Sequence, residues 1–539
     1  MSGAGRKTIL RGAVSSFMGT GLSRVLGMAR EVAISNVYGA SKLTDIFFMA
    51  FTIPSIFRRF VADEGLTGIL IPSVTSVEKE EGEAVARQIA GGILLGVTVA
   101  SLLVIGFAVL FAPDIVSVMA SKYTGDDRAL AIELTRWLMP FLLCVAWVSF
   151  AEGLLNQRGH FFVPKLAPGL VSAGIVIAAL WAKQMETPPV FALVVGTLVG
   201  GLVHVLICLP PLFSLWGRVW PSFAGVRHPK FKHFLREMGK VVAIGVFAQL
   251  NIFVLRTVAL FLEDGAVSWY WYANRVVDLA QGVVAIAVGS ALLPAITKNV
   301  VDRNWDGFRD SFGFAVRLTS FGLLLAAAML IAVAEPICSV LFLHGATTPD
   351  DVWRIAELLR AFVPYLLVVG GINLIKRAYY ALDDRRTLLW IGGVGVGLTA
   401  VLGIGLSLGD MPESMRWLPG LPSGAGLGAI GLVWALNISC AVQFGLYVLR
   451  LRGQVVGGAG IRALFGPLGK MCLAALPAGG VAWLICTACD WTAGPALTKI
   501  VFLGLSIGVG SLTYAGVAWV LKLRELRVAV DRIRARLGR

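Results

Sequence analysis

Arginine side chains occur inside apolar segments of this chain that are long enough to cross a lipid bilayer. Five such residues are Arg24, Arg30, Arg58, Arg59 and Arg275. At the centre of a lipid-facing helix each would cost about 3 kcal/mol, and five would cost on the order of 15 kcal/mol, comparable to the stability of a whole domain. We therefore expect them to face a water-filled interior. A cationic cavity inside a membrane protein favours an anionic ligand.

The composition indicates a polytopic membrane protein. Of the 539 residues, 57% are hydrophobic and 15% are charged, and the mean hydropathy is +0.80, whereas a soluble domain carries about 25% charged residues. The net charge of +15 falls largely in short loops, as expected for cytoplasmic loops, so nucleic acid is not an expected partner. Cys486 and Cys489 form a C-x-x-C pair without a second pair, so no metal site is expected.

Fourteen apolar windows follow one another along the chain, each long enough for a membrane span. They are 8–36, 44–76, 88–118, 130–156, 164–184, 189–215, 238–262, 268–297, 310–342, 353–381, 387–408, 424–450, 464–487 and 497–521. The boundaries after even-numbered windows are rich in Lys and Arg, which predicts that both termini are cytoplasmic. The expected fold is an all-α polytopic membrane protein with 14 transmembrane helices.

A weak internal repeat divides the chain into two lobes. Residues 39–74 run from Gly-Ala through aromatic residues and Arg58 to Leu-Ile-Pro, and residues 265–296 run from Gly-Ala through aromatic residues and Arg275 to Leu-Leu-Pro. We expect a six-span lobe at 1–216, a basic cytoplasmic linker at 217–237, a second six-span lobe at 238–452, and two extra spans with a basic tail at 453–539. The linker is either ordinary or an amphipathic helix. Transporters built from two such lobes hold their substrate where the lobes meet.

The first span carries two arginines that differ in direction. Arg24 and Glu31 are seven residues apart and share one face of a helix, whereas Arg30 lies about 120° from Arg24. Arg30 either reaches the same cavity through a bend in the helix or extends to a membrane interface. The sequence leaves both alternatives open.

The second and eighth spans carry the remaining arginines. Arg58 and Arg59 diverge by about 100°, so only one of them is expected to face the cavity. Arg275 and Asp278 are three residues apart and are predicted to pair on one helix face. Asp45, near the start of the second span, either interacts with the helix dipole or takes part in transport.

Guanidinium groups suit phosphate because they donate two parallel hydrogen bonds and keep their charge in a dry site. Arginines that converge from two lobes suit a diphosphate, and Arg24, Arg58 and Arg275 are predicted to form the two sides of such a clamp. The sequence contains no phosphate loop, nucleophile elbow or pair of catalytic carboxylates. No catalytic residue is therefore assigned, and the chain is expected to be a transporter rather than an enzyme.

The motifs around these residues resemble the MurJ (MviN) family of lipid II flippases, within the multidrug/oligosaccharidyl-lipid/polysaccharide exporter superfamily. The motifs are Ser23-Arg24-Val25-Leu26-Gly27-Met28-Ala29-Arg30-Glu31, Thr44-Asp45-Ile46-Phe47-Phe48, Arg58-Arg59, Glu64-Gly65, Tyr272-Ala273-Asn274-Arg275 and Leu292-Leu293-Pro294. The resemblance covers the whole chain. Asn274 stands where many members of the family carry Asp, which leaves Asp278 as the acid beside Arg275.

The resemblance implies alternating-access transport of lipid II, the undecaprenyl-diphosphate-linked peptidoglycan precursor, from the cytoplasmic to the periplasmic leaflet of the bacterial inner membrane. It implies substrate binding by Arg24, Arg58, Arg275 and Arg30. Asp45 and Glu64 match acidic positions of gating or structural type, and Asp278 and Glu31 are assigned the same kind of role. The last two spans imply a groove for the lipid tail.

No cofactor is expected, and coupling to the membrane potential or to a monovalent cation is left open. We expect a monomer, either alone or associated with cell-wall synthesis proteins. One alternative is a flippase for another polyprenyl-diphosphate-linked glycan. A membrane-embedded glycosyltransferase would need a catalytic carboxylate and a sizeable extracytoplasmic loop, and neither is evident. A drug exporter for organic cations would favour acidic residues in the cavity.

Overall fold

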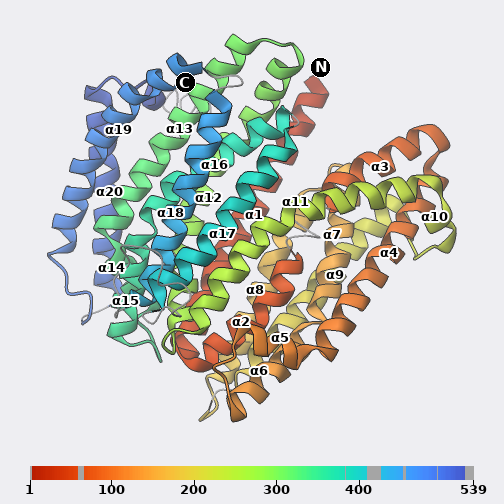
Figure 1. Cartoon of the computed structure of the whole chain (residues 1–539), viewed down its shortest axis with the longest axis horizontal. Helices are drawn as coiled ribbons and strands as arrows, with labels where there is room; N and C mark the ends of the chain where they lie inside the picture. The colour runs from red at the N-terminus through yellow and green to blue at the C-terminus, as the bar shows by residue number, and fades with distance from the viewer. Residues whose placement is uncertain are drawn as a thin grey trace. The chain divides into compact units, whose positions relative to one another are not determined.

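A computed structural model of the chain describes residues 3–58, 66–187, 189–382, 384–408, 426–452, 457–493 and 496–527. Within these ranges every regular element is a helix and no strand occurs (Figure 1). The chain divides into two compact units, unit 1 at Met1–Ser268 and unit 2 at Trp269–Arg539. Each unit is described by itself.

Unit 1 contains eleven helices among its described residues. They are α1 (Gly3–Tyr38), α2 (Lys42–Arg58), α3 (Leu66–Glu81), α4 (Glu83–Leu110), α5 (Ala112–Met119), α6 (Gly125–Leu138), α7 (Phe141–Gln157), α8 (Phe162–Ala182), α9 (Phe191–Trp216), α10 (Phe223–Arg227) and α11 (Pro229–Leu260). The next helix, α12 (Ala266–Val301), begins in unit 1 and continues into unit 2.

Unit 2 continues with eight further helices in the part of the chain that is described. They are α13 (Trp305–Ala332), α14 (Ala334–Phe342), α15 (Pro349–Ala361), α16 (Val363–Ala381), α17 (Arg385–Ser407), α18 (Gly428–Leu451), α19 (Gly457–Cys486) and α20 (Ala496–Val520).

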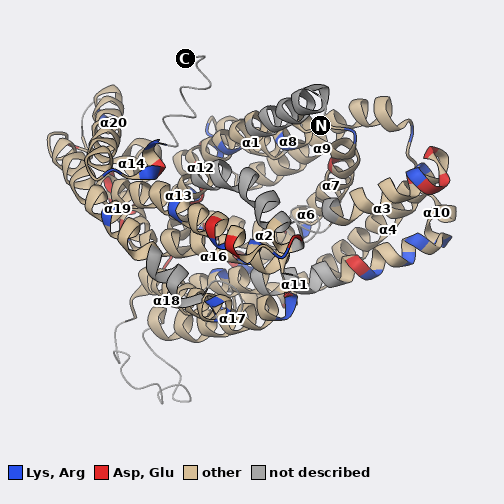
Figure 2. Ribbon diagram, turned by 90° about the horizontal axis from the view of Figure 1, so that it is seen from above, with Lys and Arg blue, Asp and Glu red and all other residues tan. Residues whose placement is uncertain are grey.

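Each predicted apolar window coincides with one helix or two consecutive helices. Among the described residues nine segments are long and apolar enough to cross a membrane, and the pair α15 and α16, bent by 43°, makes a tenth. The chain is an all-α polytopic membrane protein, as predicted, and the count of fourteen spans stays a prediction. Charged residues are sparse along the ribbons (Figure 2).

Small residues allow the helices of unit 1 to approach closely. A Cβ atom added at Gly174 of α8 would lie 2.5 Å from the carbonyl oxygen of Gly196 in α9, so a larger residue cannot fit there. A Cβ atom added at Gly169 of α8 would likewise lie 3.1 Å from Cα of Ser23 in α1. Further along, Lys183 Nζ donates to Asn36 Oδ1 at 2.8 Å. Contacts that advance together in sequence show that α1 and α8 run parallel, as the first and fifth of the predicted spans should.

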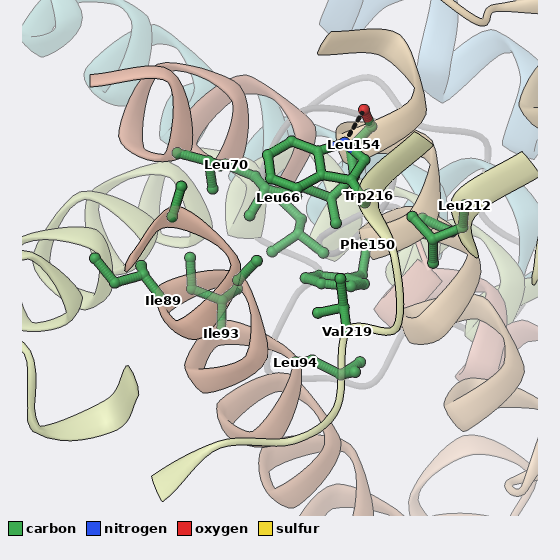
Figure 3. Close-up of a cluster of buried hydrophobic side chains, with 14 of the residues drawn as sticks. Leu66, Leu70, Ile89, Ile93, Leu94, Phe150, Leu154, Leu212, Trp216 and Val219 are labelled. Carbon is green, nitrogen blue, oxygen red and sulfur yellow. Dashed lines mark hydrogen bonds between the residues drawn. The ribbon is translucent and has the colours of Figure 1, made fainter. Parts of the chain in front are cut away.

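A cluster of buried apolar side chains joins α3, α4, α7 and α9 (Figure 3). It includes Leu70, Ile93 and Phe150, and Trp216 closes it at the end of α9. The indole N–H of Trp216 donates to the carbonyl oxygen of Leu154 at 3.0 Å, so its one polar atom is satisfied. This cluster fixes the framework against which α11 also packs.

The segment 217–237, predicted as a linker or an amphipathic helix, contains α10 and the first turns of α11. Pro229 starts α11, and His228 accepts a hydrogen bond from the Lys230 amide at the helix cap. Phe231 and Phe234 are buried in the cluster of unit 1 rather than placed against lipid. Helix α11 thus belongs to unit 1, whereas the sequence repeat puts the same segment at the start of the second lobe.

In unit 2, α19 and α20 lie side by side and pack against α13 (Figure 1). Ala474, Ala478 and Tyr514 form the buried side of this contact, and the Tyr514 hydroxyl donates to the carbonyl oxygen of Phe321 at 2.9 Å. The other sides of these helices expose leucines such as Leu476 and Leu512. Such exposed apolar faces suit contact with lipid; the predicted tail groove stays a prediction.

Candidate functional site

Arg24 lies on α1 on a different side from the contact with α8. A Cβ atom added at Gly169 of α8 would lie 3.1 Å from Cα of Ser23 and 2.9 Å from a side-chain methyl carbon of Leu26. Arg24 is about 100° from Ser23 around the helix. Arg24 is partly exposed, yet its Nη1 atom is buried and makes no hydrogen bond within the described part of the chain. A buried charged donor without an acceptor costs more than 1–3 kcal/mol. The site therefore contains a cationic donor that an anionic ligand would satisfy.

Arg30, six residues later on the same helix, has a different environment. Its side chain is buried, and it forms an ion pair with the fully buried carboxylate of Glu31, with Nε donating to Oε1 at 3.2 Å. The guanidinium also lies 5.8 Å from the centre of the Phe51 ring of α2, which is within the range of a cation–π interaction. The Arg30 side chain is thus packed among other side chains of unit 1, and Glu31 balances its charge.

Arg58 is the last residue of α2, and its side chain lies outside the described residues. Arg59 and Glu64 fall in 59–65, which is also outside them. The roles predicted for these residues therefore stay predictions.

Arg275 and Asp278 form the ion pair that their spacing predicted. Nη1 of Arg275 is 3.9 Å from Oδ2 of Asp278, and about a third of each side chain or more is exposed. The same carboxylate oxygen accepts a hydrogen bond from Nδ2 of Asn274 at 3.3 Å. Asp278 therefore interacts with both residues of the Asn-Arg pair.

Asp45 acts at the start of another helix rather than at the start of its own. Its Oδ2 accepts from the Gly265 amide at 2.8 Å, and its Oδ1 accepts from the amide and the hydroxyl of Ser268 at 2.9 and 2.6 Å. Gly265, the residue before α12, has a φ of 92° and no side chain with which to cap the helix. The buried carboxylate of Asp45 supplies the missing acceptor and the negative charge that a helix N-terminus favours.

Four charged residues surround this turn, and we call them the turn cluster: Lys42, Lys122, Asp127 and Asp264. Lys42 Nζ is 3.1 Å from Asp127 and 3.5 Å from Asp264, and Lys122 Nζ is 3.8 Å from Asp264. The carboxylates of Asp127 and Asp264 raise the pKa of Lys42 above its ordinary value. The cluster joins the turns before α2, α6 and α12. Nothing in the local sequence relates these three turns, so the turn cluster could not be predicted from it.

Arg256 of α11, an arginine of the seventh predicted span, is tied to α2. Its Nη1 donates to the hydroxyl of Thr52 at 2.7 Å, and Thr52 in turn donates to the carbonyl oxygen of Phe48 at 2.6 Å. This contact connects α11 to the helix that carries Asp45.

Other polar side chains within predicted spans make contacts between helices. Glu152 of α7 pairs with Lys165 of α8 at 2.5 Å, and Asn437 of α18 donates to the carbonyl oxygen of Ala361 in α15 at 2.8 Å. Among the described residues no group of three or more His, Cys, Asp or Glu could hold a metal ion. These polar residues are interhelical contacts.

Comparison with known proteins gives one consistent relationship. A family profile described as "Lipid II flippase MurJ" matches residues 34–528. A protein of Burkholderia cenocepacia named "Lipid II flippase MurJ" is 29% identical over 524 residues, which cover 94% of this chain and 96% of that protein. A Vibrio cholerae protein named "Probable lipid II flippase MurJ" is 26% identical, covering 97% of this chain and 99% of that protein.

Solved structures share the fold. One described as "Lipid II flippase MurJ, inward closed conformation" has a TM-score of 0.76 at 20% identity and covers 94% of this chain and 98% of that one. An inward-facing multidrug resistance MATE family transporter of the MOP superfamily has a TM-score of 0.64 at 16% identity, covering 84% of this chain and 99% of that one.

Proposed function

Because the chain belongs to the MurJ family of lipid II flippases, we propose that it moves lipid II from the cytoplasmic to the periplasmic leaflet of a bacterial membrane by alternating access. It is a transporter and not an enzyme, and it is a multi-pass membrane protein. Lipid II joins a sugar-peptide head to a long polyprenyl tail through a diphosphate. A transporter of this lipid must therefore stabilise negative charge in a site from which bulk water is partly excluded.

The observation that carries the proposal beyond family membership is the environment of Arg24. Its Nη1 atom is buried and has no hydrogen-bond acceptor among the described residues, and its neighbour Ser23 faces α8 instead. Diphosphate oxygens are strong acceptors for a guanidinium, and the planar group can bind two of them at once. Arg24 thus binds the diphosphate, and the unmet donor is the part of the site that the substrate completes.

Arg275 is the second arginine that we assign to the substrate. It is about a third exposed, and the distance of 3.9 Å to Asp278 is longer than a hydrogen bond. We therefore assign Asp278 the role of orienting the Arg275 guanidinium, with Nη1 and Oδ2 too far apart for a hydrogen bond. Arg58 is assigned to the substrate on the family motif alone.

Asp45 joins the start of α2 to the turn before α12. Three hydrogen bonds join it to Gly265 and Ser268, and the turn cluster adds weaker interactions around them. An alternating-access transporter must open and close both ends of its pathway. We assign Asp45 to this gate, which opens when the N-terminus of α12 leaves the carboxylate.

Finer features of the proposal follow from charge and composition. Both termini are assigned to the cytoplasm because the boundaries after even-numbered predicted spans are rich in Lys and Arg. The protein is proposed to act as a monomer that cell-wall synthesis proteins can contact. Transport is coupled to the membrane potential or to a monovalent cation. Membrane potential acts directly on charged groups, at about 2.3 kcal/mol for each elementary charge moved across 100 mV.

Complementation tests the assignment of the arginines. A cell depleted of its own lipid II flippase is given the native chain or the variants Arg24→Ala, Arg58→Ala and Arg275→Ala. We expect the native chain to restore growth and each variant to fail while it still inserts in the membrane. The matched control is Arg309→Ala, because Arg309 is an exposed arginine outside the family motifs and pairs with the nearby Asp306 at 2.8 Å.

Two outcomes would count against the proposal. Growth with all three variants would show that these arginines do not form a required diphosphate site. If the native chain is correctly inserted and does not restore growth, lipid II is not its substrate. Lysine at the same positions should restore growth only in part, because an ammonium group keeps the charge but loses the bidentate geometry.

A further inference from the structure

A pocket lies in unit 2 between the first turns of α17 and the last turns of α18. It encloses about 550 Å³ and is lined by Arg386, Thr387, Trp390, Ile391, Leu446, Leu449 and Arg450. The two helices run antiparallel, since Thr399 bonds to Ser439 at 2.9 Å and Tyr447 bonds to the carbonyl of Leu388 at 3.5 Å. The pocket volume is within the range of about 300–1,000 Å³ that small-molecule sites occupy.

The lining changes from cationic to apolar along both helices. On α17, Arg386 precedes Trp390 by one turn, and on α18, Arg450 follows Leu446 by one turn. Residues four apart lie on the same face of a helix. Both arginines therefore lie at the ends of the helices, and both apolar residues lie toward the middle of the span. A ligand with a charged head and an apolar tail matches this order.

Among the described residues, no acid compensates either guanidinium group. Neither makes a hydrogen bond or ion pair with any residue that the structure describes. Asp384 lies two residues before Arg386, and its carboxylate accepts from the amide and the hydroxyl of Thr387 at 3.1 and 2.8 Å, where it caps α17. The head of the ligand is therefore anionic.

The open side of the pocket suits a bilayer. Both α17 and α18 are candidate membrane spans, and Trp390 is 62% and Leu449 is 64% exposed. Tryptophan is enriched at the level of lipid head groups. The surrounding chain from 376 to 386 and from 450 to 452 carries six basic residues and two acidic ones, and basic pockets between spans bind anionic lipid head groups.

We infer that this pocket binds an anionic phospholipid of the surrounding membrane. Arg386 and Arg450 hold the phosphate, and the acyl chains lie along Trp390, Ile391 and Leu446. The pocket uses none of the arginines assigned to lipid II. The inference is therefore independent of the proposed function, and a phospholipid here would act as a bound lipid rather than as cargo.

Native mass spectrometry of the purified full-length chain tests this. Phosphatidylglycerol is titrated against the native protein and the double variant Arg386→Gln/Arg450→Gln, with phosphatidylcholine as the zwitterionic lipid. At about 1 kcal/mol for each basic residue near an anionic lipid, the double variant should bind phosphatidylglycerol at least about tenfold more weakly. Phosphatidylcholine should bind both proteins equally, and inorganic phosphate should not displace phosphatidylglycerol.

The matched control is Arg385→Gln/Arg452→Gln, which removes the same charge from neighbouring arginines that do not line the pocket. It should keep native affinity within about twofold. Trp390→Ala should weaken phosphatidylglycerol binding with no change of charge. If the double variant does not fold, Arg386→Gln and Arg450→Gln alone should each weaken binding about fivefold.

Three results would overturn the inference. The first is native affinity in the variants that lack Arg386 and Arg450. The second is an equal loss in the control pair, which would indicate a diffuse charge effect rather than this pocket. The third is displacement by inorganic phosphate, which would identify a small-anion site without a role for the lipid tail.

Discussion

Two arginines of α1, six residues apart, occupy opposite kinds of environment. Arg30 is buried, pairs with the carboxylate of Glu31 and lies over the ring of Phe51. Arg24 is partly exposed and carries a buried donor atom that has no acceptor among the described residues. A buried cation whose charge is balanced by the protein contributes to the fold. A cation with an unmet donor is available to a ligand.

This comparison separates two residues that share one family motif. Both arginines fall in the motif that resembles lipid II flippases, and that resemblance implies substrate binding by both. Their partners in the structure favour a structural role for Arg30 and a binding role for Arg24. Each role has its own measurable consequence, so variants at either position can test whether Arg30 is structural and Arg24 binds the substrate.

The largest effect is expected for Glu31→Gln. Removing one partner of a buried ion pair leaves an uncompensated charge and typically costs about 3–5 kcal/mol. We expect a marked fall in the melting temperature and in the amount of inserted protein. Arg24→Gln serves as the control and should melt no lower than the native chain, because it removes a donor that has no acceptor among the described residues. Equal melting of Glu31→Gln and the native chain would mean that Arg30 does not depend on this pair and is available to substrate.

A comparable effect, in binding rather than stability, is expected for Arg24→Gln. Loss of a charge-assisted contact in a desolvated site costs about 2–5 kcal/mol, which is a factor of about thirty or more in affinity. Affinity for a polyprenyl diphosphate can be measured on the purified chain. Arg24→Lys should recover part of the loss. Unchanged affinity in Arg24→Gln would place the diphosphate elsewhere.

A smaller effect is expected for Asp45→Ala. Loss of an N-cap side chain costs about 0.5–2 kcal/mol, and here the cap belongs to α12. Hydrogen exchange should become faster at the amides of Gly265 and Ser268, because in the native chain these amides donate to Asp45. Lys42→Ala is the control, because this exposed residue belongs to the turn cluster but does not contact those amides. Unaltered exchange in Asp45→Ala would show that the cap does not hold the turn.

The smallest effect on stability is expected for Asp278→Asn. The pair with Arg275 spans 3.9 Å and is partly exposed, and such pairs contribute about 0–1 kcal/mol. The melting temperature should therefore stay close to native, while transport falls if the carboxylate orients the guanidinium. A large loss of stability would instead make Asp278 a structural acid, like Glu31.

The sequence predicted the fold well where a local signal exists. Hydropathy located windows that each contain helices, and the spacing of Arg275 and Asp278 predicted their ion pair. Both signals depend on residues within a few helical turns. The sequence left the segment 217–237 open between a linker and an amphipathic helix, because the burial of Phe231 and Phe234 depends on contacts with helices distant in sequence, such as α3 and α4.

The site was less predictable because its contacts are distant in sequence. Asp45 and Ser268 are 223 residues apart, and no property of Asp45 alone identifies its partner. One signal was present, since Gly265 precedes α12 without a capping side chain and the first amides of a helix need an acceptor. For Arg24 and Arg30, helical spacing gives direction but not burial, so it could not separate their roles.

We propose that Arg24 binds the lipid diphosphate during flipping while Arg30 supports the fold. The most direct test measures how much lipid II an impermeant reagent can modify at the outer face of cells that depend on this chain. With Arg24→Gln, correctly inserted and melting like the native protein, lipid II should stay on the inner leaflet and escape modification. Native levels of modification with Arg24→Gln would show that flipping does not depend on diphosphate binding by Arg24.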